Sequence, residues 1–137
     1  MTITEVSRRY GLSADTLRYY ERVGLIPAVH RTPGGIRDYT DEDCSWVEFV
    51  KCMRSSGLPV EAVSEYVSLS QQGESTYEAR RQLLIEQRRG LEERMAEMQR
   101  TLDRLNAKIE RYEQWSPKAG EAPAPCKKQL GADTETQ

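Results

Sequence analysis

At residues 13–25 the chain reads SADTLRYYERVGL, and this stretch carries the clearest structural signal in the sequence. Ser13 is a preferred N-cap residue, and Asp15 follows in the first turn, where an acidic side chain favours the helix dipole. Gly24 can adopt the left-handed conformation that ends a helix. The pattern therefore predicts a short helix that begins after Ser13 and stops at Gly24.

A second short helix is predicted immediately before this one. Thr4 can cap that helix, which runs through Tyr10 and stops at Gly11. Two short helices joined by a tight turn are typical of the helix-turn-helix motif, and we expect that motif here.

The segment after Gly24 predicts a small β-hairpin. Turn residues TPGG (32–35) separate two short extended runs at 25–31 and 36–39. A hairpin that directly follows a helix-turn-helix is expected to form the wing of a winged helix.

Two further helices are expected after the hairpin. Thr40 and Asp43 form a T-x-x-D capping pattern for a third helix, which ends at Gly57. Pro59 suits the first turn of a fourth helix. These elements together predict a first domain over residues 1–72.

A long helix is predicted from Ser75, where STYE forms an S-x-x-E capping box, to Trp115. Its apolar residues recur every seven positions with a second set between them, as in a coiled coil. They are Tyr77, Leu84, Leu91, Met98, Leu105 and Tyr112, with Met95, Leu102 and Ile109. Arg81 and Arg88 interrupt this stripe. A second chain is needed to cover it, so residues 75–115 are expected to form a dimerisation helix.

Composition and charge set the remaining limits. The run from 116 to 137 is rich in Pro, Ala, Gly and charge without any period, so we expect a disordered tail. The chain has neither a run of about 18 apolar residues nor a secretory signal pattern, so a cytoplasmic protein without a membrane partner is expected. Residues 1–40 hold six arginines, no lysine and four acidic residues. Arginine without lysine suits contacts with phosphate or guanine.

The three cysteines, Cys44, Cys52 and Cys126, have no C-x-x-C spacing. They therefore predict neither a disulfide framework nor a zinc site, and we expect free thiols, no metal and no cofactor. Cys44 follows three acidic residues in the first turn of its helix and is expected to be structural. Cys126 lies in the tail, where it could resolve an oxidised Cys52 as a disulfide or be inert.

The second helix carries side chains suited to DNA. A helix that enters the major groove needs short polar and arginine side chains near its N-terminus, with aromatic or arginine side chains to hold phosphates. Thr16, Arg18, Tyr19 and Tyr20 supply both kinds. Of the two adjacent tyrosines, we expect one to pack and one to contact DNA.

These motifs resemble those of the MerR family of bacterial transcription regulators. The resemblance rests on R-Y-Y-E-x-x-G-L in the helix-turn-helix, R-x-x-x-G-I-R-D-Y in the hairpin and the long final helix, and it covers residues 1 to about 115. It implies a mainly α-helical homodimer, in which a winged helix-turn-helix domain is joined to an antiparallel coiled coil. It also implies binding to double-stranded promoter DNA, which the regulator distorts so that RNA polymerase can engage it.

The resemblance implies particular DNA contacts as well. Those of the recognition helix are Ser13, Thr16, Arg18, Tyr19 and Tyr20, and those of the wing with the DNA backbone are Arg31, Arg37 and Tyr39. His30, beside Arg31, is a further candidate for a phosphate contact.

Within the family, the metal-sensing and drug-binding branches do not fit. The long helix contains no cysteine or histidine, only Cys126 follows it, and a tail of this length has no room for a separate ligand domain. The stretch VKCMRSSG (50–57) instead resembles the branch that responds to aldehydes and related electrophiles, in which the cysteine at the place of Cys52 is the sensor. Thiol oxidants are a second class of signal for such a residue.

Two roles for Cys52 stay open on the sequence alone. Lys51, Arg54 and a nearby helix end can favour its thiolate, whereas Glu48 opposes it. The alternative is a buried, inert thiol, in which case the regulator would sense a noncovalent ligand at its dimer interface.

Other classes of protein fit less well. An architectural protein that bends DNA without sensing would not explain the long heptad helix. A coiled-coil adaptor would not explain Arg18, Tyr19, Tyr20 and the wing. An enzyme is not expected, because His30 is the single histidine and the chain has no phosphate-binding loop.

Overall fold

The computed structural model describes residues 1–115, and the predicted tail (116–137) lies outside the described residues. The described part of the chain is mainly helical, with 74% of its residues in helices. It forms two compact units, Met1–Glu93 and a second one that begins at Arg94. Within the described part, no helix combines the length and apolar character needed to cross a bilayer.

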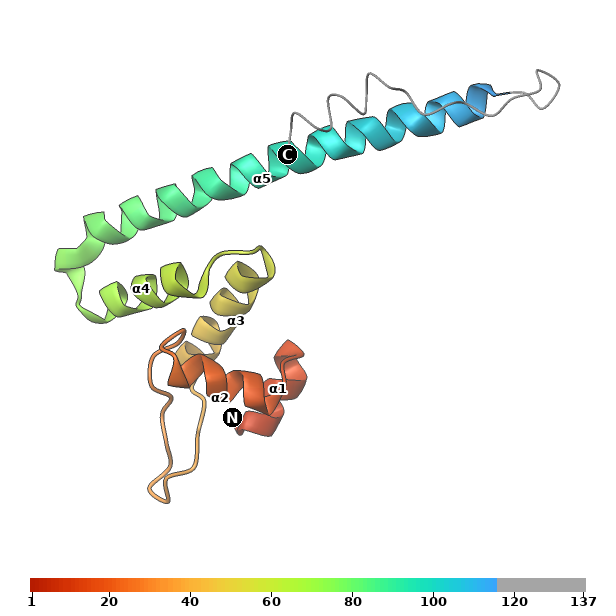
Figure 1. The fold of residues 1–137 in the computed structure, drawn as a ribbon. Coiled ribbons are helices and arrows are strands. Elements are labelled where there is room, and N and C mark those ends of the chain that lie inside the picture. Colours follow the sequence, from red (N-terminus) through yellow and green to blue (C-terminus); the bar gives the residue numbers. More distant parts are fainter. Residues whose placement is uncertain (116–137) are drawn as a thin grey trace. The chain divides into compact units, whose positions relative to one another are not determined.

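The helix-turn-helix consists of α1 (Ile3–Tyr10) and α2 (Ala14–Arg22) (Figure 1). The predicted cap at Thr4 is wrong. Thr2 caps α1 instead, because its hydroxyl accepts from the Glu5 N–H while the Glu5 carboxylate accepts from the Thr2 N–H. Gly11 ends the helix with a φ of 65°, as the sequence predicted.

The start of α2 is confirmed. Ser13 is its N-cap, and its Oγ accepts from the Thr16 N–H at 3.0 Å. The helix ends at Arg22, and Gly24 follows with a φ of 77°. Its inner face contributes Leu17 and Tyr20 to the core of the first unit.

The wing is a loop with less backbone pairing than the predicted two-stranded hairpin. Among the described residues it contains one antiparallel bridge, between Arg31 and Arg37. The Thr32 N–H donates to the Ile36 carbonyl at 2.8 Å, and the Asp38 N–H donates to the His30 carbonyl at 2.7 Å. The loop extends away from the helices (Figure 1), and Ile36 near its tip is 68% exposed.

Two more helices complete the first core. Helix α3 (Asp41–Ser55) begins with the predicted capping box of Thr40 and Asp43, and α4 (Val60–Gln71) follows Pro59 as its N-cap. The fully buried side chains of the unit include Val6, Leu17, Leu25, Val47 and Val50. This core fixes the positions of α2 and the base of the wing.

The long helix α5 spans Tyr77–Gln114, preceded by a 3-10 turn, η1 (Glu74–Thr76). The predicted capping box at Ser75 does not form, because Ser75 lies inside the 3-10 turn and Glu78 accepts from the side chains of Arg81 and Gln82 instead. Helix α5 has no buried residue. In the single chain, every residue of its predicted apolar stripe is exposed except Leu91, which is half-buried.

Candidate DNA-binding surface and reactive thiol

The first turn of α2 presents a fixed pair of hydroxyls. Ser13 Oγ accepts from the Thr16 N–H and donates to Thr16 Oγ1 at 2.9 Å. Ser13 is exposed and Thr16 is half-buried. Because the cap fixes both rotamers, these hydroxyls form a rigid polar edge at the N-terminus of the helix.

Arg18 and Tyr19 extend the exposed side of α2. The guanidinium of Arg18 contacts Asp15 Oδ1 at 2.9 Å, but the Asp15 side chain is 96% exposed. Such a surface ion pair contributes little and can exchange for a phosphate or a base edge. Tyr19 is 37% exposed, and the guanidinium of Arg22 lies 5.6 Å from the centre of its ring.

Two predicted contacts are core residues instead. Tyr20 is 6% exposed and Tyr39 is 2% exposed, and burial raises the pKa of both hydroxyls. The Tyr39 hydroxyl is buried without a hydrogen-bond partner among residues 1–115. The sequence predicted that one of Tyr19 and Tyr20 would pack, and that one is Tyr20. Buried rings cannot reach a DNA backbone, so we assign Tyr20 and Tyr39 to packing.

Glu21 is the functional residue that sequence reasoning missed. Its carboxylate accepts from Arg37 Nε at 2.7 Å and from the Val29 N–H at 2.9 Å, and it lies 3.7 Å from Arg31 Nη2. Burial alone would raise the pKa of Glu21, but these hydrogen bonds and the two arginine charges lower it below its ordinary value. One carboxylate on α2 therefore holds both wing arginines beside the helix.

The two wing arginines remain available to an anion. They face each other across the Arg31–Arg37 bridge, and their side chains are 45% and 24% exposed. Arg31 Nη1 also donates to the Gly35 carbonyl at 3.1 Å. Because a guanidinium has five N–H donors, each arginine can keep these contacts and still bind a phosphate.

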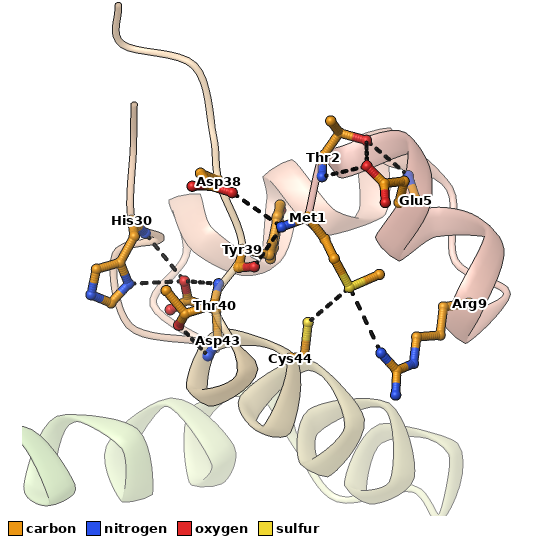
Figure 2. A network of polar contacts seen from close by, with 10 residues as sticks. All are labelled: Met1, Thr2, Glu5, Arg9, His30, Asp38, Tyr39, Thr40, Asp43 and Cys44. Carbon is orange, nitrogen blue, oxygen red and sulfur yellow. Dashed lines mark hydrogen bonds and ion pairs between the residues drawn. The ribbon is translucent and has the colours of Figure 1, made fainter. Parts of the chain in front are cut away.

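A second network fastens the wing to α3 (Figure 2). The Asp43 carboxylate is buried and accepts from the N–H groups of His30 and Thr40, and His30 Nδ1 lies 2.9 Å from the same oxygen. The hydrogen bond and charge of Asp43 raise the pKa of His30. Burial opposes ionisation of Asp43, but the hydrogen bonds it accepts lower its pKa. His30 thus anchors the base of the wing.

The returning end of the wing also pairs with the first residue of the chain. The Met1 ammonium donates to Asp38 Oδ1 at 3.1 Å and to the Tyr39 carbonyl at 2.8 Å, and the Tyr39 N–H donates to the Met1 carbonyl (Figure 2). Both ends of the wing are therefore held.

The two described cysteines differ in access. Cys44 is 4% exposed and lies 4.0 Å from the Met1 sulfur, whereas Cys52 is exposed. The alternative of a buried thiol at residue 52 is therefore wrong for the chain by itself.

Both basic neighbours of Cys52 in the sequence donate to backbone carbonyls. Lys51 Nζ donates to the Tyr10 carbonyl, and Arg54 Nη1 donates to the Leu58 carbonyl. Helix α3 ends at Ser55, so the nearby helix end is the negative one, which does not favour an anion. Access, more than a neighbouring charge, distinguishes this thiol. Within residues 1–115, no group of three or more His, Cys, Asp or Glu side chains could hold a metal ion.

Comparison with known proteins identifies one family. Residues 1–69 match the model described as MerR HTH family regulatory protein, and residues 45–108 match the model described as MerR, DNA binding. The HTH-type transcriptional regulator AdhR of Bacillus subtilis is 54% identical over 91 residues, which are 66% of this chain and 65% of AdhR. An uncharacterised HTH-type transcriptional regulator of Haemophilus influenzae is 31% identical over 82% of this chain and 83% of its own length.

Solved structures agree with this match. A MerR family transcriptional regulator from Listeria monocytogenes has a TM-score of 0.84 and 41% identity, covering 100% of this chain and 99% of that one. HiNmlR, a MerR family regulator lacking the sensor domain and solved bound to promoter DNA, has a TM-score of 0.74 and 31% identity. That match covers 82% of this chain and 90% of HiNmlR.

Proposed function

The chain belongs to the MerR family of helix-turn-helix regulatory proteins, and we propose that it regulates transcription from a promoter in response to aldehydes or related electrophiles, through Cys52. The DNA-binding part of this proposal rests on one observation. Glu21 holds Arg31 and Arg37 beside the helix that presents Arg18 and Tyr19, so the recognition helix and the wing form a single cationic surface.

We propose as DNA contacts those predicted residues whose side chains are not buried. We assign Ser13, Thr16, Arg18 and Tyr19 to the major groove and its edges, with Arg31 and Arg37 on the flanking backbone. HiNmlR was solved on promoter DNA, and its similarity to this chain supports the same kind of partner here. A DNA-binding regulator of this kind acts in the cytoplasm, where promoter DNA is found.

The active form is a homodimer joined through α5. The stripe leaves large apolar side chains exposed, with Met98 at 70%, Leu105 at 55% and Ile109 at 53%. An exposed stripe at heptad spacing is typical of a coiled coil, and an antiparallel pair would place one DNA-binding unit at each end. Two units could then read two half-sites, and the bound promoter is presented to RNA polymerase.

The sensing step is an addition reaction. The Cys52 thiolate sulfur adds to the carbonyl carbon of an aldehyde, the C=O π electrons move to oxygen, and that oxygen takes up a proton to give a hemithioacetal. The step needs no oxidant. The adduct adds bulk at the last turn of α3, and repacking there would change the separation of the two DNA-binding units.

In vitro transcription tests this proposal. Promoter DNA from upstream of the gene is transcribed with wild-type, Cys52→Ser or Cys126→Ser protein, each with and without acetaldehyde. We expect activation with wild-type and Cys126→Ser protein and none with Cys52→Ser. Activation that persists in Cys52→Ser would assign sensing to a noncovalent site, and promoter binding without any activation would indicate an architectural protein.

A further inference from the structure

The last turn of α2 carries an arginine that the DNA contacts proposed above leave out. Arg22 is exposed and is the final residue of the helix. The other exposed residues of α2 are Asp15, Arg18 and Tyr19, and their spacing of three, four and seven positions places all four on one face. Arg22 therefore lies on the same face of the helix as side chains assigned to DNA.

The positive charge of Arg22 has no counter-charge in contact with it. Both acidic residues of α2 already contact other arginines, because Asp15 pairs with Arg18 and Glu21 pairs with Arg37. Within residues 1–115, the guanidinium of Arg22 makes no hydrogen bond and no ion pair. Its five N–H donors are therefore free to bind an anion.

The ring of Tyr19 holds this guanidinium. The two groups form a cation–π contact, with the guanidinium carbon of Arg22 5.6 Å from the centre of the ring. Tyr19 is 37% exposed, so the protein covers most of its surface and restricts its movement. A guanidinium that lies over an aromatic face keeps N–H donors available at its edge, and it loses less freedom when it binds. Stacking therefore prepares Arg22 for contact with an anion.

The length of α2 can bring its last turn to the phosphates. The nine residues of the helix span about 13 Å at 1.5 Å per residue. The major groove of B-DNA is about 12 Å wide, and the phosphates of the two strands border it. A helix that reads bases with Ser13 and Thr16, at its N-terminal end, can therefore place its C-terminal end at the edge of the groove.

We propose that Tyr19 and Arg22 act as one unit, in which the Tyr19 ring positions the guanidinium of Arg22 on a backbone phosphate at the edge of the major groove. This inference rests on the DNA-binding surface proposed above and adds a residue to it. A phosphate fits better than a base edge, because Arg22 lies at the end of the helix farthest from the base-reading first turn. The alternative is that Arg22 only stabilises the negative end of the helix dipole, as a basic residue in a last turn does.

Fluorescence anisotropy of the full chain on promoter and scrambled DNA, at several salt concentrations, tests the phosphate contact. Arg22→Gln should weaken binding to both DNAs by about tenfold and lower the salt dependence by about one ion. The matched control is Arg9→Gln, because Arg9 lies in the last turn of α1 and its guanidinium is also 5.6 Å from a tyrosine ring, that of Tyr10. We expect Arg9→Gln to bind both DNAs as wild type does. Urea denaturation should give similar free energies of unfolding for the two variants, since each loses one exposed charge in a last turn.

A double-mutant cycle tests whether the two side chains act as one unit. Tyr19→Leu removes the ring, so Arg22→Gln should cost much less affinity in this background than in wild type. Arg22→Lys keeps the charge but loses the planar group that stacks on the ring. We expect it to keep the salt dependence of wild type while binding several-fold more weakly.

Three outcomes would overturn the proposal. Equal affinity and salt dependence in Arg22→Gln and Arg9→Gln would mean that Arg22 does not touch DNA. Equal losses from Arg22→Gln with and without the Tyr19 ring would mean that the two side chains act separately. If Arg31→Ala also left the salt dependence unchanged, the whole DNA-binding surface would be wrong, and that result differs from a failure at Arg22 alone.

Discussion

The carboxylate of Glu21 connects helix α2 to the wing, because it accepts a hydrogen bond from Arg37, which lies 16 positions further along the chain. Replacing Glu21 by glutamine keeps the shape but removes the charge that pairs with Arg37 and Arg31. Since the carboxylate is mostly buried, with 13% of its side chain exposed, we expect Glu21→Gln to lower the free energy of unfolding by about 1 to 2 kcal/mol at pH 7. Urea denaturation followed by circular dichroism measures this loss.

The sign of the pH dependence follows from the lowered pKa of Glu21. Its contribution to stability is complete above its ordinary value of 4.5 and is lost as the pH falls through the lower value of the folded state. The gap between wild type and Glu21→Gln should therefore narrow as the pH is lowered from 7 to 3. An unchanged gap would show that the charge of Glu21 contributes nothing.

Arg18 and Arg31 should affect DNA binding in different ways. Arg31→Ala removes a backbone contact, so promoter and scrambled DNA should lose affinity equally, and the salt dependence should weaken by about one ion. Arg18→Ala should lower affinity for the promoter more than for scrambled DNA, because it is assigned to base edges. Fluorescence anisotropy at several salt concentrations separates the two. Affinity insensitive to salt would contradict the proposed surface.

The roles that could be predicted from the sequence are those that depend on neighbouring residues. The caps at Ser13 and Thr40 were predictable because each depends on a partner three residues away. The choice of Tyr20 over Tyr19 for the core, and the role of Glu21, depend on residues distant in sequence. Adjacent residues on a helix point about 100° apart, so the sequence says that one tyrosine packs without saying which.

The wing is held as an element by the contact of His30 with Asp43. The raised pKa of His30 means that this stabilisation is present below its ordinary value of 6.5 and is lost as the pH rises through the higher folded value. We expect the free energy of unfolding of wild-type protein to decrease slightly between pH 6 and pH 9. In His30→Gln this decrease should be smaller, because the contribution of the His30–Asp43 pair is missing. Parallel urea titrations at the two pH values provide the comparison; identical slopes would exclude the pair as the cause.

The helices were more predictable than the wing. Helices α1 to α5 follow from apolar spacing and turn residues, and their bounds differ from expectation by a few residues at most. The expected two-stranded hairpin has a single bridge, because its shape is held by side chains of α2 and α3 more than by strand pairing. The 3-10 turn before α5 arises in a similar way, since the Thr76 hydroxyl donates to the Leu69 and Gly73 carbonyls.

The proposed homodimer requires that a second chain cover the stripe of α5, and one substitution can test this requirement. Leu102 is 49% exposed in the single chain and lies in the middle of the stripe. Leu102→Lys should prevent dimerisation, because a helix pair would bury an unpaired ammonium at its centre. Ala96→Lys adds the same charge away from the stripe and serves as the matched control. Sedimentation equilibrium should give the monomer mass of 15.7 kDa for Leu102→Lys and twice that for the control.

Loss of dimerisation should lower the affinity for the promoter, since a dimer that has bound one half-site engages the second at a high effective concentration. For Leu102→Lys we expect a loss of at least a hundredfold on the full promoter and little change on a single half-site, because the DNA-binding surface itself is intact. A variant that remained dimeric would place the dimer contact elsewhere. A monomer that kept full promoter affinity would show that each unit binds alone, and a change in the spacing of two units could not then transmit the signal from Cys52.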